Sequence, residues 1–419
     1  MRGLRFALLG AAVLGALALA GPATAARPGY VISKAALPGD VATARALLNR
    51  ARRAAPSGSR TRRDITYVLR LGAKMMKPRQ PAGRRATAAR TLRVNAWWYS
   101  RRTAPRLRVI ARLPDGILAT YWGGRGFAIN PVATTGRWQN LNAHVSPETL
   151  ATALLPLGVR RNAGRTRFLL WEYYDVPDKP GAIRPGASGM AQGRIAQLMA
   201  RAYHRTGDRR FATAARGALA AFTVPVSQGG VVSQVAEPAG ITPMPWYVER
   251  AYPRANPWKG AALNGFMVTL LNLHATAPLL RARPLGRGSA SSEVRTRQQA
   301  AGSQESGDLA LALMRAGERT LVQYLPLHDT GTWSLYGLLT PGRAWRSYLA
   351  DEGYHCYHVS LLRKLARISP QLGFGDVADR WKDYGLRVGV TCESGSLPPP
   401  SPPPGALGGP GVPLSRDAG

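Results

Sequence analysis

The amino-acid sequence predicts a mainly helical protein with a small amount of β-structure. Most segments after Pro131 carry apolar residues at three- and four-residue spacing, as the buried face of a helix requires. Gly, Pro or Asp recurs between these segments, which favours helical hairpins joined by alternating short and long connections. The β-structure is expected at 107–122, where two β-favouring runs flank the turn signal Pro-Asp-Gly.

Helices are expected along most of the chain. Near the N-terminus, helical spacing is present at 41–55 and 64–76, with loops at 55–63 and 77–85, and we expect these helices to pack outside the main body. The later helices are expected at 141–159, 188–222, 264–280, 308–325, 357–369 and 374–388.

Changes in composition mark the two ends of the chain and one internal segment. Two arginines precede an apolar run from Phe6 to Ala20 and a small-x-small site that ends at Ala25, as in a secretory signal peptide. An uncleaved anchor is the alternative. The expected regions are a signal peptide at 1–25, a helical and hairpin region at 27–126, a helical domain at 127–392 with a flexible insertion at 279–307, and a Pro-rich disordered tail at 393–419.

The charge of the chain points to an acidic partner. There are 57 basic and 22 acidic residues, a formal net charge of +35, and such a field concentrates polyanions. A compositional bias of the whole chain towards Ala, Arg, Gly and Pro is the alternative explanation. An export signal and the lack of a recognition module disfavour nucleic acid. No stretch after the signal is expected to span a membrane, so we predict a secreted or cell-wall-associated protein that binds an acidic polysaccharide.

Two cysteines, Cys356 and Cys392, are too few for a disulfide scaffold or a cysteine-ligated metal. In an oxidising compartment they could pair with each other, and two free buried thiols are the alternative. His355 and His358 lie three residues apart, but the sequence nearby offers neither a third ligand nor an HExxH motif. We therefore expect no metal and no cofactor.

Residues 324–365 concentrate the polar and aromatic side chains that suit an active site. Three of the six histidines lie here. Tyr336 and Tyr354 are each followed by apolar residues that can bury one face, which would hold both tyrosines at the rim of a core.

Four motifs resemble the C-terminal domain of D-glucuronyl C5-epimerases, which invert the C5 stereocentre of uronic acids within a polysaccharide. In the family's order they are SGMAQG at 188–193, WYVERAYP with LNGFM within 246–267, DTGTWSLY at 329–336 and YHCYHVSLLRKL at 354–365. The resemblance covers roughly 127–390. It implies an incomplete (α/α) barrel, or toroid, with the site in a groove at one end of the helices.

Epimerisation at C5 needs two proton-transfer groups that face each other across the sugar ring. The resemblance implies that Tyr354, Tyr336 and Tyr252 are catalytic tyrosines. Glu249 is the expected opposite base, although family members carry a glutamate directly before the tyrosine where this chain has Ala251. A helical backbone would place Glu249 and Tyr252 on one face, whereas an extended backbone would point them to opposite sides.

Further side chains are expected to contact the substrate. One histidine and an arginine would bind the uronate carboxylate, and two amides would bind sugar hydroxyls, with core hydrogen bonding as the alternative for the amides. These residues are His355, His358, Arg343, Gln192 and Asn264.

The sequence thus predicts a secreted uronyl C5-epimerase, an isomerase. Two alternatives stay open. A polysaccharide lyase would remove the same C5 proton and then expel the O4 substituent, and the fold and the base residues do not separate these reactions. A non-catalytic glycan-binding protein is favoured by the departure at Ala251. A homodimer is a further expectation.

Overall fold

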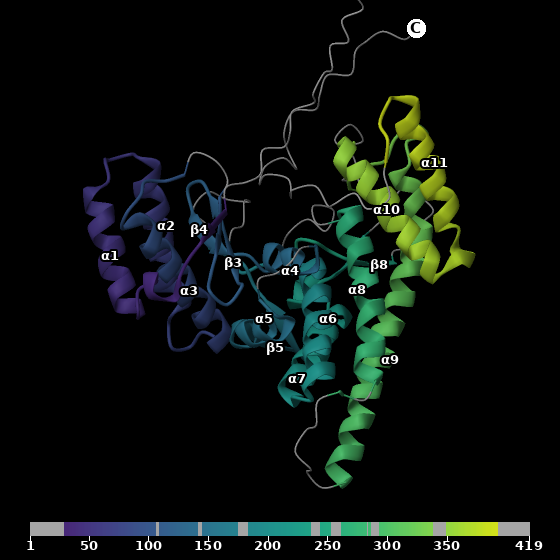
Figure 1. Cartoon of the computed structure of the whole chain (residues 1–419), viewed down its shortest axis with the longest axis horizontal. Coiled ribbons are helices and arrows are strands. Elements are labelled where there is room, and N and C mark those ends of the chain that lie inside the picture. The colour runs from purple at the N-terminus through teal and green to yellow at the C-terminus, as the bar shows by residue number, and fades with distance from the viewer. Residues whose placement is uncertain are drawn as a thin grey trace, which may run out of the picture.

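The computed structural model describes residues 29–105, 109–140, 145–174, 183–235, 244–252, 261–282, 284–285, 293–337 and 349–392. Within these ranges the protein is mainly helical, with three small sheets, as the spacing of apolar residues predicts. The N-terminal helices lie at one side of the molecule, and the last two helices lie at the other (Figure 1). The expected signal peptide and C-terminal tail lie outside the described residues.

Three helices and a four-stranded sheet form the N-terminal region. The helices are α1 (Val41–Ala54), α2 (Arg60–Met75) and α3 (Ala82–Tyr99). The strands, in spatial order, are β1 (Gly29–Val31), β2 (Ile110–Arg112), β3 (Leu118–Trp122) and β4 (Gly126–Ile129). The hairpin predicted at 107–122 is confirmed, since β2 and β3 pair antiparallel. Gly116 supplies the positive φ of +86° that its turn requires.

The N-terminal region differs from the sequence prediction in three ways. Helix α3 is not among the predicted helices. Both expected loops are shorter, because α2 begins at Arg60 and α3 begins at Ala82 with Pro81 as its N-cap. The helices also do not pack outside the main body, since one cluster of contacting buried side chains extends from Ile32 to Cys392. Trp98 in the last turn of α3 packs on Phe127 with ring centroids 5.0 Å apart.

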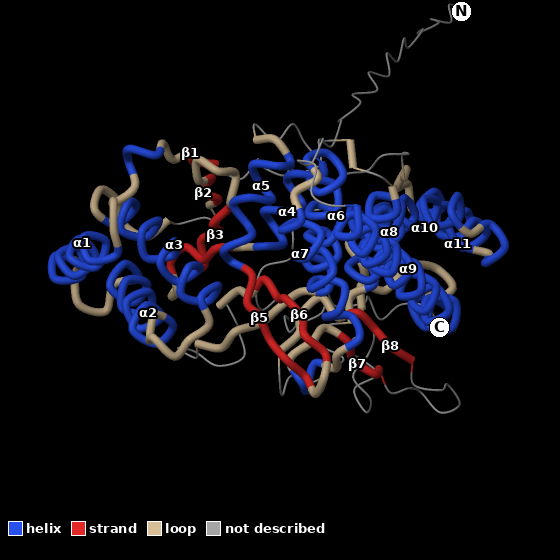
Figure 2. The backbone as a smooth tube through the Cα atoms, turned by 90° about the horizontal axis from the view of Figure 1, so that it is seen from below, coloured by secondary structure: helices blue, strands red, loops and turns tan. Residues whose placement is uncertain are grey.

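The middle of the chain alternates helices with two hairpins. Its elements are α4 (Pro131–Asn140), α5 (Pro147–Leu154), β5 (Gly158–Ala163), β6 (Thr166–Trp171), α6 (Gly189–Thr206), α7 (Arg209–Ala220), β7 (Val232–Val235) and β8 (Met244–Tyr247). The pairs β5–β6 and β7–β8 are antiparallel and lie along one side of the helices (Figure 2). Neither hairpin is predicted from the sequence, because their strands are short and only partly alternate in polarity.

Four helices complete the chain: α8 (Leu263–Arg281), α9 (Glu293–Tyr324), α10 (Glu352–Ile368) and α11 (Phe374–Arg387). Figure 1 shows α6, α8 and α9 side by side. Short 3-10 turns lie at Lys34–Ala36, Leu155–Leu157, Ala221–Thr223, Val226–Gln228, Leu325–His328 and Pro370–Leu372. The helices predicted between 188 and 388 are therefore present.

The buried position of α8 explains its composition. By length and apolar content alone α8 could cross a membrane, since its mean hydropathy is 1.2. The expectation that no stretch after the signal peptide is long and apolar enough to span a membrane is therefore wrong as far as composition goes. However, 72% of that window is buried inside the protein, where α8 packs between α6 and α9. A core helix of this kind accounts for the hydrophobicity.

The segment expected as an insertion, 279–307, is helical over most of its described length. The last residues of α8 take up 279–281, and α9 begins at Glu293. The sequence prediction gave weight to the polarity of this segment, whereas Gln, Ala and Glu are also good helix formers.

The predicted disulfide is present, since Cys356 and Cys392 are bonded with their Cα atoms 4.8 Å apart. Cys356 lies in the second turn of α10, and Cys392 follows α11. The bond therefore ties the end of the described chain to the YHCYH motif.

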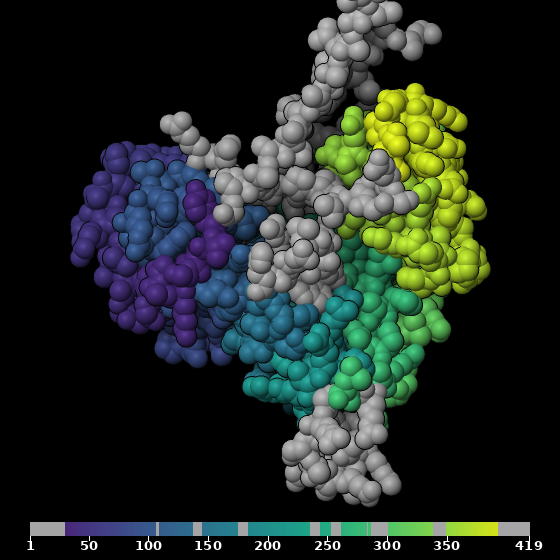
Figure 3. Space-filling model, in the orientation of Figure 1, coloured from purple at the N-terminus to yellow at the C-terminus, as the bar shows by residue number. Residues whose placement is uncertain are grey.

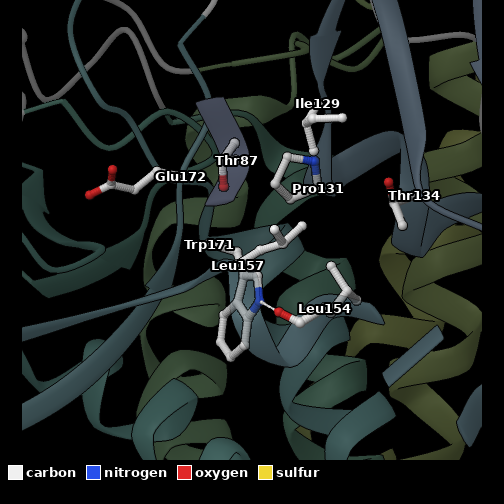
Figure 4. A pocket seen from close by; sticks show the side chains of 8 residues that line it. All are labelled: Thr87, Ile129, Pro131, Thr134, Leu154, Leu157, Trp171 and Glu172. Atoms are coloured by element: carbon white, nitrogen blue, oxygen red, sulfur yellow. Dashed lines mark hydrogen bonds between the residues drawn. The ribbon is translucent and has the colours of Figure 1, made fainter. Parts of the chain in front are cut away.

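A small cavity of about 10 Å³ lies where the N-terminal region meets the middle of the chain (Figure 4). Its lining is mostly apolar, and the Trp171 indole beside it donates to the Leu154 carbonyl over 2.8 Å. A space of this size holds at most one water molecule, so the cavity is no site for a sugar.

Candidate active site

The N-terminus of α8 is the point at which the sequence motifs converge. Its N-cap, Ala262, offers no side-chain oxygen to the first N–H groups of the helix. The Leu263 amide donates to the Tyr336 carbonyl over 2.9 Å, and Ala262 pairs with Gly337 in an antiparallel bridge. The LNGFM and DTGTWSLY motifs are thereby joined at a helix end that favours negative charge.

The Glu249 carboxylate lies against this helix end. A Cβ atom added at Gly265, in the first turn of α8, would lie 3.2 Å from Glu249 Oε2. The Tyr336 hydroxyl donates to the same oxygen over 3.4 Å. Glu249 as a whole residue is half-buried, and its carboxylate is held by these contacts.

The surroundings of Glu249 adjust its acidity in opposing directions. Burial raises the pKa of the Glu249 carboxyl above its ordinary value. The charges of Arg250 and Arg194 and the Tyr336 hydroxyl limit this increase in pKa. A carboxylate with a raised pKa is a stronger base and suits proton abstraction near neutral pH.

Tyr336 also contacts Tyr354. Their rings meet edge to face with centroids 4.6 Å apart, and Ala262 and Ala350 complete this buried cluster. Tyr354 lies in the first turn of α10, where its amide donates to the N-cap side chain of Asp351 over 2.8 Å. The helix cap thus fixes the start of α10 and with it the position of Tyr354. Tyr336 and Tyr354 are in this way brought together with Glu249.

Tyr252 occupies the other side of Glu249. The backbone between them bends and then forms a bridge at Ala251, so the shared helical face is not present. The ring of Tyr252 packs edge to face on Tyr173, with centroids 5.9 Å apart. The Tyr173 hydroxyl in turn lies 3.1 Å from the Ala187 carbonyl and 3.3 Å from the Glu249 carbonyl, and its single proton is shared between these two acceptors. Gly186 lies beneath Tyr252, where an added Cβ would come within 1.8 Å of the ring.

These contacts connect five residues, here called the line across the site, and the link between Glu249 and Tyr173 runs through the Glu249 backbone carbonyl. In order they are Tyr354, Tyr336, Glu249, Tyr173 and Tyr252. Four of these five are sequence candidates, and Tyr173 is an addition that no motif indicated.

Arg194 is a second residue that the sequence prediction missed. It is only 4% exposed on α6, donates to the Val132 carbonyl over 3.5 Å, and its Nε has no hydrogen-bond partner among the described residues. Burial lowers the pKa of its guanidinium, while Tyr357 and Glu249 act against that change in pKa. An arginine directly after the SGMAQG motif, among the buried residues at the start of α6, is the signal that could have identified it.

His355 lies in the core rather than in the site. It is fully buried and stacks on Trp333 with ring centroids 3.7 Å apart. Its Nε2 donates to the Trp381 carbonyl over 2.8 Å, which leaves Nδ1 to accept from the Ser334 hydroxyl at 2.8 Å. With both nitrogens bonded to protein, His355 is not placed to contact a uronate.

His358 and His328 are also fully buried. Because the Ser334 hydroxyl proton is given to His355, the His358 Nδ1–H donates to Ser334 Oγ over 3.1 Å. The Nε2 atoms of His358 and His328 have no hydrogen-bond partner among the described residues. Burial lowers the pKa of His358 well below its ordinary value and that of His328 to about 4, so both rings are neutral.

The remaining candidates fall into three groups. Gln192 is a core residue, since its amide accepts from the Trp171 amide over 3.4 Å and donates to the Leu169 carbonyl. Asn264 lies in the first turn of α8, and its Oδ1 has no hydrogen-bond partner within the described part of the chain. Arg343 lies outside the described residues.

Comparison with known proteins places this geometry in context. The family model described as D-glucuronyl C5-epimerase C-terminus matches residues 170–383, about half of the chain. A D-glucuronyl C5-epimerase from Caenorhabditis elegans is 32% identical over 210 residues. That alignment covers 50% of this chain and 30% of the worm protein, so the chain spans about a third of the length of this relative. All five side chains of the line across the site lie within the matched residues.

Proposed function

Because the chain belongs to the D-glucuronyl C5-epimerase family, we propose that it inverts C5 of hexuronic acid residues in an acidic polysaccharide. It would thus act as an isomerase. The observation that carries the proposal is the hydrogen bond from Tyr336 to the Glu249 carboxylate, with the ring of Tyr354 packed on that of Tyr336. A carboxylate base and two tyrosines gathered in one place are the parts that a two-base reaction needs.

In the proposed reaction Glu249 takes the C5 proton from one face of the sugar. The electron pair of the broken C–H bond is delocalised into the adjacent carboxylate, and the Tyr354 hydroxyl returns a proton to the opposite face. The turnover leaves Glu249 protonated and Tyr354 as phenolate, and exchange of one proton with solvent at each group restores the starting state. No proton or electron is gained or lost overall.

Positive potential supports the charged intermediate. The N-terminus of α8 directs its first N–H groups towards the region where Glu249 lies, and Arg194 adds a buried cation behind it. Asn264 Oδ1 accepts a hydrogen bond from a sugar hydroxyl in this proposal, because burial without a partner is costly for an amide oxygen.

We also propose the setting in which the enzyme works. The helices form an incomplete (α/α) barrel with the substrate groove at the N-terminal end of α8. The protein is secreted after removal of residues 1–25, or stays associated with the cell wall, and the Cys356–Cys392 disulfide suits that oxidising location. The excess of positive charge favours an acidic polymer over a neutral one.

The test is hydrogen exchange at C5. The protein is incubated with polyglucuronate in heavy water, and the polymer is analysed by nuclear magnetic resonance. We expect deuterium at C5 together with the inverted sugar. New ultraviolet absorbance from an unsaturated uronate would replace the proposal with a lyase reaction. Tight binding without exchange or absorbance would reduce the protein to a glycan-binding role.

A further inference from the structure

The N-terminal helices carry an excess of positive charge that the catalytic proposal does not use. Residues 29–105 contain three lysines and fifteen arginines but only two acidic residues, Asp40 and Asp64. Asp40 caps α1, and Asp64 is buried, where it accepts from two tyrosine hydroxyls. Within the described part of the chain, the region's ion pairs are Arg84–Glu172 and Arg90–Asp115. Most of its cations therefore have no carboxylate to neutralise them within the described residues, although some, such as Arg63 and Lys74, also donate to backbone carbonyls.

Three of these cations form a row on α2, here called the α2 stripe: Arg63, Arg70 and Lys74. All three are exposed. At about 100° per residue, spacings of seven and four place them within about 40° of one another on the helix. The row is about 16 Å long, at about 1.5 Å per residue.

The α2 stripe borders the face by which α2 packs on the catalytic half of the chain. Tyr67 and Leu71 are buried next to the stripe, in a cluster with Tyr174 and Ile183. The Lys74 ammonium donates to the Ile183 carbonyl over 3.0 Å. One end of the stripe is therefore fixed to residue 183.

Residue 183 leads directly into the active site. Exposed Arg184 comes next, then Gly186, whose Cα lies against the Tyr252 ring. Ala187 pairs with Ala251, the residue before Tyr252. The cations of the α2 stripe are thus continued by Arg184 towards the Tyr252 end of the line across the site.

Helix α1 carries a similar charge without this connection. Arg45, Arg50 and Arg53 are exposed on it. However, α1 packs mainly on α2 and α3, and it lies at the outer edge of the N-terminal region (Figures 1 and 2). Figure 3 shows the N-terminal region as the side of the molecule opposite α10 and α11. Comparing α1 with α2 therefore distinguishes the effect of the amount of positive charge from the effect of where that charge lies.

We propose that the α2 stripe and Arg184 bind acidic groups of the polysaccharide on sugars beyond the one that reacts. The identity of the polymer rests on the function proposed above. Guanidinium and ammonium groups recognise carboxylate and sulfate through charge-assisted hydrogen bonds, and spaced cations suit a polymer with regularly spaced anions. The stripe lies outside the family match at 170–383, so it is a feature added to the catalytic part.

The test compares two triple variants that lose the same charge. Arg63→Gln/Arg70→Gln/Arg184→Gln, called the stripe variant, removes both arginines of the α2 stripe together with Arg184 and keeps Lys74, which is bonded to Ile183. Arg45→Gln/Arg50→Gln/Arg53→Gln is the matched control on α1. Affinity for long polyglucuronate chains and for a short uronate fragment is measured at low and high salt. We expect the stripe variant to bind long chains about tenfold or more weakly, with a flatter salt dependence. The control should stay within about twofold of wild type, and the short fragment should be unaffected in both.

Two results would overturn the proposal. One is wild-type affinity of the stripe variant for long chains, and the other is an equal loss in the α1 control, which would show a general charge effect. If the triple variant does not fold, Arg70→Gln/Arg184→Gln with Arg50→Gln/Arg53→Gln as its control gives the same comparison. Absence of C5 exchange by wild type would remove the proposed reaction but would leave this affinity comparison valid.

Discussion

The first turns of α10 present two faces that differ in chemistry. Tyr354 contacts Tyr336, and Tyr357 lies near Arg194 and Glu249. We call this the tyrosine face. The histidine face, formed by His355 and His358, bonds Ser334 and lies about 100° around the helix from the tyrosine face, at about 100° per residue. Both faces come from the five residues YHCYH.

In the proposed reaction, the bonding partners of a side chain, more than its residue type, select the reactive groups. Histidine is the most frequent general base in enzymes, and two histidines in a motif invite that role. Here both histidines are fully buried and bonded to Ser334, whereas the tyrosine face, also buried, lies next to the Glu249 carboxylate. The histidine face would therefore position the tyrosine face without taking part in proton transfer.

The largest effect should come from the tyrosine face. Tyr354→Phe should lower C5 exchange by about a hundredfold to ten-thousandfold, the range for loss of a general acid–base group. Deuterium incorporation into polyglucuronate measures the effect. Tyr203→Phe, which removes a buried hydroxyl near Ser303, is the matched control and should keep exchange within about threefold. Full exchange by Tyr354→Phe would remove Tyr354 from the mechanism.

Glu249→Gln should cost about a hundredfold to a thousandfold. The base must be ionised, so wild-type exchange should rise with pH through the pKa of Glu249. Because burial raises that pKa, the rise should lie above pH 4.5. The pH profile of kcat/KM checks this, and the variant should lose the rise. If the variant keeps both the rate and the rise, Tyr252 or Tyr336 is the opposite base.

Loss of the disulfide should affect both faces together, because Cys356 lies between them. The double variant Cys356→Ala/Cys392→Ala should lower the free energy of unfolding by about 3 kcal/mol, since the bond closes a long loop in the unfolded chain. Urea titration measures the change. Two thiols that alkylate in the unreduced wild type would contradict the bond.

The histidine face and His328 should make stability depend on pH. Their pKa values are lowered on folding, so the unfolded chain binds more protons than the native state between pH 6.5 and about 4. Stability is complete above that window and falls as pH decreases, by about 1.4 kcal/mol per pH unit for each such histidine. Urea titrations at pH 7, 6 and 5 measure the slope.

His328→Asn is the variant for this test, because asparagine can still donate to the Leu335 carbonyl. The variant should reduce the dependence of the unfolding free energy on pH by the contribution of one histidine. It should leave C5 exchange at pH 7 nearly unchanged. A slope identical to that of wild type would show that His328 titrates alike in the folded and unfolded states.

Much of the fold follows from local signals in the sequence. Periodicity located the long helices, and Pro-Asp-Gly located one hairpin. Hairpins β5–β6 and β7–β8 were missed because short strands are stabilised by pairing, which a single segment does not display. Helix α3 was missed, and Gly83 in its first turn reads as a loop residue, although there it allows close packing on Gly158.

The candidate site was only partly predictable. Motifs identified Glu249 and the tyrosines, but they assigned both faces of α10 to substrate. Which face is buried depends on Ser334 and Trp381, which are distant from the motif in sequence. Arg194 was missed for the same reason, because its neighbour Glu249 is 55 positions away along the chain.

Gly186 has a consequence for how this protein can change by mutation. Exchange for alanine is the smallest enlargement of a side chain, yet the new methyl group would overlap the Tyr252 ring at 1.8 Å. The ring is backed by Tyr173 and has little room to yield. A single nucleotide change could thus displace a site tyrosine while every candidate catalytic residue stays intact. Homologous chains that carry a larger residue at this position would have to hold their tyrosine in a different way.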